Sequence, residues 1–123
     1  MKFKLYEYTY NNKVIYVGYS KDLARRHREH ITDKRSYMHY ILNALESNLR
    51  FNSENEENCL RSKKLKLVIK DKFNNISSAK SAERDLIKMY SKNSKYSKYL
   101  LNKHKYSNAN EYAEEMIDLI KKG

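Results

Sequence analysis

The sequence predicts an α/β (α+β) fold in which helices flank a small three-stranded antiparallel sheet. Two strand-like stretches open the chain, a third lies at 64–73, and segments with helical spacing follow the second and the third. Alternating apolar and polar residues mark half-buried strands, whereas a period near 3.6 marks amphipathic helices. Since the chain has 123 residues and neither an internal repeat nor a long linker, we expect residues 1–123 to form a single domain.

The first twenty residues predict a β-hairpin. Residues 2–10 (KFKLYEYTY) carry aromatic side chains at alternate positions, and residues 13–19 (KVIYVGY) are mostly apolar, as expected of two paired strands. Asn11 and Asn12 lie between them. Asparagine tolerates the left-handed backbone conformation that tight hairpin turns require, so this pair predicts the turn.

Two helices are expected next. Ser20 is suited to cap a helix over about 21–32, because its hydroxyl can accept a hydrogen bond from an N–H of the first turn. A second helix is predicted over about 36–47, where apolar residues recur at helical spacing. Residues 50–63 are polar and lack a clear period, which indicates a surface loop or insertion.

The third strand and a further helix follow that loop. In 64–73 (KLKLVIKDKF), the apolar residues Leu65, Leu67 and Ile69 fall on one face. Ser77 or Ser78 is then expected to cap a helix that runs to about residue 91. The predicted apolar face of that helix consists of Ala79, Ala82, Leu86 and Met89 or Tyr90.

The end of the chain combines a basic segment with an amphipathic helix. Residues 92–108 are rich in Lys, Ser, Tyr and Asn and are predicted to be mostly irregular. A C-terminal helix is predicted over 109–122, with an apolar stripe formed by Tyr112, Met116, Leu119 and Ile120. We expect this helix to dock on the core of the domain; the alternative is that it forms the contact surface of a protein-interaction factor.

The charge of the chain favours a polyphosphate partner. Lys and Arg number 26 against 15 Asp and Glu, for a net charge of +11 and an isoelectric point near 9.6. A compact domain this basic, with 12 tyrosines, is typical of nucleic-acid-binding proteins. Composition alone equally fits a merely soluble basic protein.

Membrane and disulfide-rich classes are disfavoured. No stretch approaches the roughly 20 apolar residues of a membrane span, and the N-terminus lacks the apolar core of a signal peptide. Cys59 is the single cysteine, which excludes a disulfide framework and a cysteine-based zinc site. We expect a cytoplasmic protein without membrane contact, in a bacterial cell or a phage-infected host, because the composition is typical of an AT-rich genome.

Candidate site residues gather around the second strand and the helix after it. Arg26 and His30 are four apart and share a helix face. Arginine is a planar, permanently charged partner for a phosphodiester, and histidine can move a proton. The alternative without a functional role is a solvated basic helix face, on which Arg25 and Arg28 would be equivalent to Arg26.

Two tyrosines strengthen this interpretation. Tyr6 and Tyr16 lie across the short hairpin and are expected to be neighbours if they share a sheet face. Gly18 lacks a β carbon, which allows backbone or substrate to approach closely at the end of the strand. The alternative is that these tyrosines simply pack in the core.

Residues 5–30 resemble the GIY-YIG nuclease family. Leu5-Tyr6 corresponds to the end of the "GIY" element and Tyr16-Val17-Gly18 to "YIG". The family pattern Gly-x-Ser-x-Asn/Asp-Leu-x-x-Arg-x-x-x-His then matches Gly18, Ser20, Asp22, Leu23, Arg26 and His30. The resemblance extends to His39, Glu83 and, more loosely, Asn102, and so covers about residues 3–102. One departure is Lys4, where the family has the first glycine of "GIY".

The resemblance implies a metal-dependent endonuclease that acts most readily on DNA. It implies Mg²⁺ (or Mn²⁺) held by Glu83, with Asp85 as the less favoured acid. Tyr6 is the candidate general base, Arg26 binds the scissile phosphate, and His30 and Tyr16 position the water. His39 supports the phosphate or the leaving group. The alternative function is a catalytically inactive nucleic-acid-binding module on the same fold.

Further contacts to nucleic acid are expected from residues around this site. They are Gly18, Ser20, Lys21, Arg25, Arg28 and Asn102. Any sequence preference would come from the 50–63 loop, from the 92–108 segment or from a homodimer. In that segment lysines alternate with Tyr96, Tyr99 and Tyr106, a mixture suited to phosphate contact and base stacking. His27 and His104 have no predicted role. The biological role (repair, restriction, phage attack or element mobility) stays open.

Overall fold

The computed structural model describes residues 2–34, 36–45, 64–102 and 109–122. The predicted 50–63 loop, Cys59, His104 and Tyr106 lie outside these residues. The elements, in order, are β1 (Phe3–Tyr10), β2 (Lys13–Ser20), α1 (Leu23–Thr32), α2 (Tyr37–Leu45), β3 (Leu65–Phe73), α3 (Ile76–Lys92), α4 (Ser94–Ser97) and α5 (Ala109–Lys122).

The three strands form one antiparallel sheet in the order β2-β1-β3. The predicted hairpin is confirmed: Asn11 and Asn12 have φ values of 48° and 65°, the left-handed pair that a two-residue turn of type I′ requires. In the β1–β2 register, Tyr6 lies opposite Gly18 and Tyr8 opposite Tyr16. One sheet face therefore carries Tyr6 and Tyr8 of β1 together with Tyr16 of β2.

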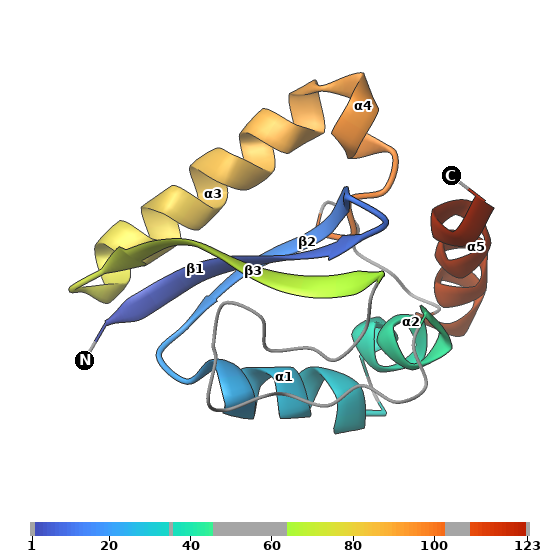
Figure 1. Cartoon of the computed structure of the whole chain (residues 1–123), viewed down its shortest axis with the longest axis horizontal. Helices are drawn as coiled ribbons and strands as arrows, with labels where there is room; N and C mark the ends of the chain where they lie inside the picture. The colour runs from blue at the N-terminus through green and yellow to red at the C-terminus, as the bar shows by residue number, and fades with distance from the viewer. Residues whose placement is uncertain (1, 35, 46–63, 103–108, 123) are drawn as a thin grey trace.

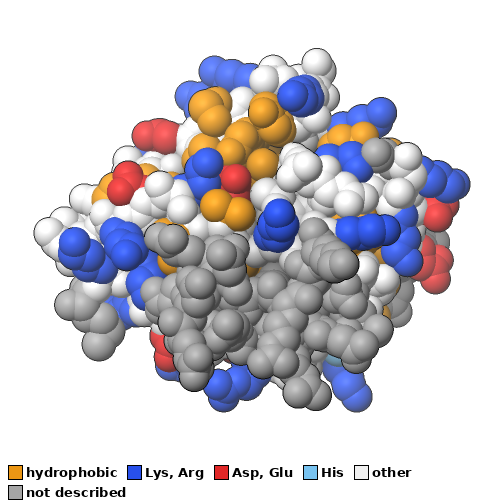
Figure 2. Space-filling view, viewed as in Figure 1, with side chains coloured by type: hydrophobic (Ala, Val, Ile, Leu, Met, Phe, Trp, Pro, Cys, Tyr) orange, Lys and Arg blue, Asp and Glu red, His pale blue; other side chains and the backbone are white. Residues whose placement is uncertain are grey.

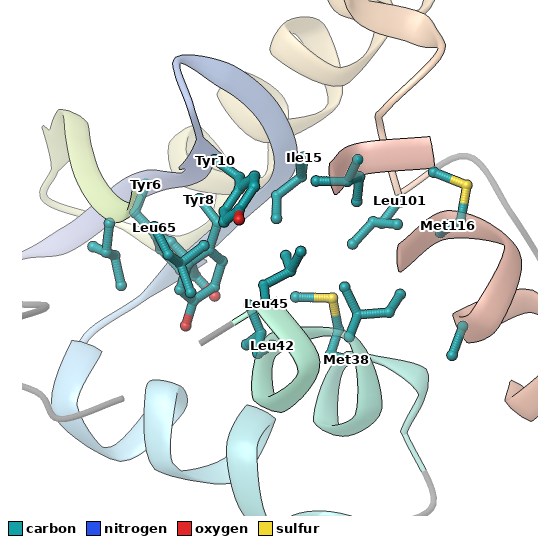
Figure 3. Close-up of a cluster of buried hydrophobic side chains, with 14 of the residues drawn as sticks. Tyr6, Tyr8, Tyr10, Ile15, Met38, Leu42, Leu45, Leu65, Leu101 and Met116 are labelled. Carbon is teal, nitrogen blue, oxygen red and sulfur yellow. The ribbon is translucent and has the colours of Figure 1, made fainter. Parts of the chain in front are cut away.

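Helices cover both faces of the sheet, and Figure 1 shows α3 along one face and α1 beneath the other. The sheet is therefore buried on two sides. A smaller core under α3 and α4 contains Leu5, Val14, Val17, Tyr90 and Leu100. The larger core lies between the opposite face, α2 and α5, where side chains such as Tyr10, Leu42, Leu45 and Met116 converge (Figure 3).

The C-terminal helix belongs to this larger core. Tyr112, Met116 and Ile120 are buried and Leu119 is half-buried, which confirms the predicted stripe. They pack with residues of α2, the neighbour of α5 in the structure. This packing favours the docked helix over the interaction surface that was its alternative.

Two predicted helix caps are wrong. The N-cap of α1 is Asp22, whose carboxylate accepts from the Arg25 N–H, while the Ser20 hydroxyl bonds to the Asp22 backbone instead. The N-cap of α3 is Asn75 rather than Ser77 or Ser78, so that helix begins earlier. Asp and Asn are as good caps as Ser, so residue type alone does not decide where these helices begin.

Of the two residues predicted as alternatives for the end of the apolar face of α3, the structure selects Tyr90. Tyr90 is buried, but Met89 is 56% exposed. Downstream, the segment predicted to be irregular forms the short helix α4, and Leu100 and Leu101 are fully buried. Among the described residues, no helix combines the length and the apolarity needed to cross a membrane.

Candidate active site at the sheet edge

The site begins where Tyr6 passes over Gly18. A β carbon on Gly18 would lie 2.6 Å from the Tyr6 hydroxyl oxygen, closer than nonbonded atoms allow. The missing side chain therefore makes room for the phenol, and the close approach expected at this glycine comes from the protein itself. The hydroxyl of Tyr6 is thereby held at the end of the edge strand β2.

Tyr6 is paired with His30 of α1. The Tyr6 hydroxyl lies 3.0 Å from His30 Nε2, and both side chains are buried. Burial raises the pKa of Tyr6 far above its usual range. Burial, together with the charges of Arg26 and His27, lowers the pKa of His30 to about 3. Since the phenol holds its proton and the imidazole is neutral, a hydrogen bond between two uncharged groups joins them.

Tyr16 completes an aromatic group with these two residues. Its ring centroid lies 6.4 Å from that of Tyr6 and 5.2 Å from that of His30. The two tyrosines are thus neighbours on one sheet face, because a register shift between Tyr8 and Thr9 pairs Tyr8 with Tyr16 rather than with Ile15. Burial raises the pKa of Tyr16, while the charge and hydrogen bonding of Arg26 oppose this rise. The guanidinium therefore stands beside both phenols.

Arg26 is the accessible cation of the site. Its side chain is 42% exposed, and its Nη1 lies 3.0 Å from a carboxylate oxygen of Glu29. Arg25, one residue earlier, is 75% exposed and pairs with the other oxygen of the same carboxylate. Glu29 thus pairs with both arginines. Of the two, only Arg26 also lines the cavity beside Tyr6 and Tyr16.

Glu83 reaches the same place from the other layer. A cavity of about 230 Å³ is lined by Tyr6, Tyr16, Gly18, Tyr19, Arg26 and Glu83. Its walls come from β1, β2, α1 and α3, so helices on opposite faces of the sheet meet at this edge. Burial raises the pKa of Glu83, and the charge of Arg26 opposes the rise. Asp85 is exposed and does not line the cavity.

A larger cavity of about 580 Å³ adjoins the first. It shares Tyr16 and Arg26 with it and is also lined by His30, Glu29 and Asp33. Arg26 therefore lines both cavities, which leaves open volume for a ligand on both sides of its side chain.

A comparison with protein families identifies the family of this chain. Residues 4–97 match the family model described as GIY-YIG catalytic domain. The chain belongs to the GIY-YIG family. No curated protein and no solved structure matches it significantly. The α+β architecture with a three-stranded antiparallel sheet agrees with the GIY-YIG nuclease fold, and the family assigns the chain endonuclease activity on nucleic acid.

The structure brings most of the GIY-YIG motif residues together, but not His39. Tyr6, Tyr16, Gly18, Arg26, His30 and Glu83 meet at the two adjoining cavities. His39 does not: its Nδ1 lies 2.6 Å from the Ile31 carbonyl oxygen, so this nitrogen carries the proton and donates to the end of α1. His39 lines neither cavity.

The residues predicted to contact nucleic acid are spread around the site. Arg28 and Lys21 are exposed, and the Lys21 ammonium lies 5.1 Å from the Phe3 ring centroid. Asn102 is committed elsewhere: its amide accepts from the Val17 N–H and donates to the Val17 carbonyl, both at 2.7 Å. Asn102 thus supports the edge strand β2, and its contact with nucleic acid stays a prediction.

The sequence did not indicate the pair Tyr8 and His27. The Tyr8 hydroxyl lies 2.6 Å from His27 Nδ1, and both side chains are buried. This pair repeats the Tyr6–His30 contact two residues along β1 and three back along α1. That double spacing was the available signal, because residues three apart on a helix and two apart on a strand share a face.

The donor set of the small cavity suits a hard cation. Among the described residues, no three His, Cys, Asp or Glu side chains gather into a metal-binding group. Glu83 offers one carboxylate beside open volume. Mg²⁺ commonly takes one or two carboxylates and fills its shell with water and phosphate oxygens. The residues present fit such an ion.

Proposed function

We propose that the chain is a divalent-metal-dependent endonuclease that hydrolyses phosphodiester bonds in DNA. The observation that carries this is the meeting of Tyr6, Tyr16, Arg26, His30 and Glu83 around two adjoining cavities. Binding alone has no need of a buried phenol–imidazole pair next to a carboxylate. Hydrolysis needs both, together with a cation for the phosphate.

The scissile phosphate is proposed to bind at Arg26. Its half-exposed guanidinium borders both cavities, and a guanidinium binds a phosphate through two parallel hydrogen bonds. Lys and Arg side chains also stand at many points of the face in Figure 2, where acidic side chains are few. A basic surface of this kind favours the binding of a polyanion.

Tyr6 and His30 are proposed to take the proton of the attacking water. Tyr6 donates its own proton to His30 Nε2 as it accepts one from water, along the 3.0 Å contact. The charge of Arg26 is one of the factors that keep His30 neutral. A phosphate bound to Arg26 offsets that charge and makes the imidazole a better base, so substrate binding prepares the relay.

Glu83 is the residue we expect to hold the divalent cation, Mg²⁺ or Mn²⁺. When bound, such an ion offsets charge on the phosphate and on the leaving oxygen. In the reaction, the water oxygen bonds to phosphorus and the bond to the 3′ oxygen breaks. The proton from water goes to Tyr6, the Tyr6 proton to His30, and the 3′ oxygen leaves as a hydroxyl after protonation from solvent.

The test is cleavage of supercoiled, branched and single-stranded DNA, and of RNA, with Mg²⁺ and with EDTA. We expect DNA cleavage that needs the metal and that falls at least 100-fold in Glu83→Gln. Asp85→Asn is the matched control, since it removes one acid from the same helix outside the cavity, and should cut normally. Equal activity of Glu83→Gln and the unaltered chain, or full activity in EDTA, contradicts the mechanism. Tight, salt-sensitive binding without cleavage of any substrate favours an inactive binding module instead.

A further inference from the structure

A third cavity lies at the other end of β2, away from the candidate active site. It has a volume of about 360 Å³ and is lined by residues 12 and 13 at the hairpin turn and by side chains of α4 and the turn after it. The lining includes three lysines, Lys13, Lys95 and Lys98, and two tyrosines, Tyr96 and Tyr99. None of its lining residues is acidic. We call it the lysine–tyrosine cavity.

The three lysines are arranged on the two rings. The ammonium groups of Lys13 and Lys98 lie 5.4 and 5.9 Å from the ring centroid of Tyr99. That of Lys95 lies 5.7 Å from the ring centroid of Tyr96. Cation–π contacts of this kind are worth about 0.5–1 kcal/mol at exposed positions. They are strong enough to orient the ammonium groups and weak enough to be exchanged for contacts with a ligand.

The rings of Tyr96 and Tyr99 are held in place by contacts with the interior of the protein. The Tyr96 ring lies 5.0 Å from that of Tyr90, which is buried and donates its hydroxyl to the Glu7 carboxylate. Tyr99 packs against the larger core. Both tyrosines are only half-buried. The rings are therefore fixed walls with an accessible part, which is the arrangement that base stacking needs.

The cavity and the candidate active site lie along the same edge strand. Lys13 is the first residue of β2 and Gly18 is near its end, a separation of about 17 Å at the rise of a strand. The outer edge of β2 between the two sites is covered by Leu101, which bonds to the Ile15 carbonyl, and by Asn102, which bonds to Val17, so a strand that joins the two sites passes over these residues. A nucleic acid strand whose phosphates are about 3.4 Å apart when stacked spans this distance in roughly five nucleotides.

We propose that the lysine–tyrosine cavity binds a nucleotide of an unpaired DNA strand within about five nucleotides of the scissile phosphate. The lysines contact its phosphates, and a base stacks on Tyr99, the ring nearest to Lys13 and Lys98. This inference rests on the proposed function for the choice of DNA as the ligand. It goes further, because it assigns a second binding site and a substrate with a single-stranded segment beside the cleavage point.

The shape of the cavity favours an unpaired strand over a duplex. Its volume suits a single small ligand group, and a base enters such a space only when it is unpaired and unstacked. A duplex would present phosphates to the lysines and leave the tyrosine rings uncovered. The apolar walls provided by two tyrosines are then unexplained, whereas an exposed base accounts for both the rings and the lysines.

The test is binding, measured separately from cleavage. Fluorescence anisotropy with labelled dT12 and with a 12-base-pair duplex is followed in the presence of EDTA, so that no cutting occurs. The variant replaces Lys13, Lys95 and Lys98 by Gln. A matched control replaces three exposed lysines that line no described cavity, Lys66, Lys72 and Lys121, also by Gln. Urea unfolding checks that both variants are folded.

We expect the cavity variant to bind dT12 at least tenfold more weakly and to lose about 2 from the slope of log affinity against log salt. The control should lose less than threefold, and Tyr99→Leu should weaken dT12 more than the duplex. Equal losses in both triple variants, or equal losses for dT12 and duplex in Tyr99→Leu, overturn the inference. This binding assay does not depend on cleavage. A chain that binds as expected here but shows no cleavage in the separate nuclease assay contradicts the proposed function alone.

Discussion

The ring of Tyr6 lies over Gly18, its partner on the neighbouring strand. A β carbon at Gly18 would stand 2.6 Å from the hydroxyl oxygen of Tyr6 and 2.7 Å from the ring carbon that bears it. Tyr6 is only 1% exposed and has no room to withdraw. The orientation of the phenol toward His30 and the small cavity therefore depends on the absence of a side chain at position 18.

Gly18→Ala should displace the phenol. The added methyl group overpacks a filled site, so we expect a loss of about 1–3 kcal/mol in the free energy of unfolding. Cleavage should fall by at least tenfold, because the hydroxyl moves relative to His30 and the substrate. Urea unfolding and the rate of plasmid cleavage measure the two effects. A variant with unchanged stability and unchanged rate contradicts the packing described for this pair.

The two tyrosine–histidine pairs offer a matched comparison. Tyr6→Phe and Tyr8→Phe each remove one buried hydroxyl that bonds to a histidine of α1, so each should cost about 1 kcal/mol of stability. Only Tyr6 lines a cavity beside Arg26 and Glu83. We therefore expect cleavage to fall by about 100-fold or more in Tyr6→Phe and by less than threefold in Tyr8→Phe. Comparable losses of cleavage in both folded variants would disprove the distinction.

The buried histidines predict that the fold loses stability in mild acid. Burial lowers the pKa of His27 to about 4, and burial with the charges of Arg26 and His27 lowers that of His30 to about 3. The unfolded chain binds both protons near pH 6.5, and the folded chain does not. The stabilisation is thus complete above pH 6.5 and is lost as the pH falls toward 4, by up to about 1.4 kcal/mol per pH unit for each histidine.

His27→Gln isolates this effect. Glu83, whose pKa is raised by burial, acts with the opposite sign, since its folded form binds a proton more readily than the unfolded chain does. The comparison therefore uses the difference between the variant and the unaltered chain in urea unfolding at pH 7, 6 and 5. The unaltered chain should lose stability more steeply. Parallel curves would show that His27 takes up its proton in the folded state.

Local patterns in the sequence were enough to predict the elements and the centre of the site. The Asn11-Asn12 turn follows from the tolerance of asparagine for positive φ. The shared face of Tyr6 and Tyr16 depends on the register shift between Tyr8 and Thr9, which the alternation of residues does not contain. Helix starts were less predictable, because Ser20 and Asp22 are equally suitable caps only two residues apart. Hydrogen-bond geometry rather than residue type decides between them, and a sequence does not contain it.

The partners of single polar residues depend on contacts far apart in the chain. The spacing of Arg26 and His30 predicted their shared face, but the burial of His27 depends on where Tyr8 lies across the layer. His39 resembled a site residue by position, yet its ring caps the preceding helix. Such roles are fixed by how α1, α2 and the sheet pack, which local patterns do not specify.

A substitution at Asn102 tests whether this residue has a structural role or a role in binding nucleic acid. Its amide makes two hydrogen bonds of 2.7 Å to the N–H and the carbonyl of Val17, a fully buried residue of the edge strand β2. Asn102→Ala leaves both backbone groups without this partner, so we expect a loss of about 1–3 kcal/mol in the free energy of unfolding. The affinity for DNA and its salt dependence, measured on the folded variant, should stay within twofold. A variant of unchanged stability whose affinity drops tenfold would instead identify Asn102 as a nucleic-acid contact.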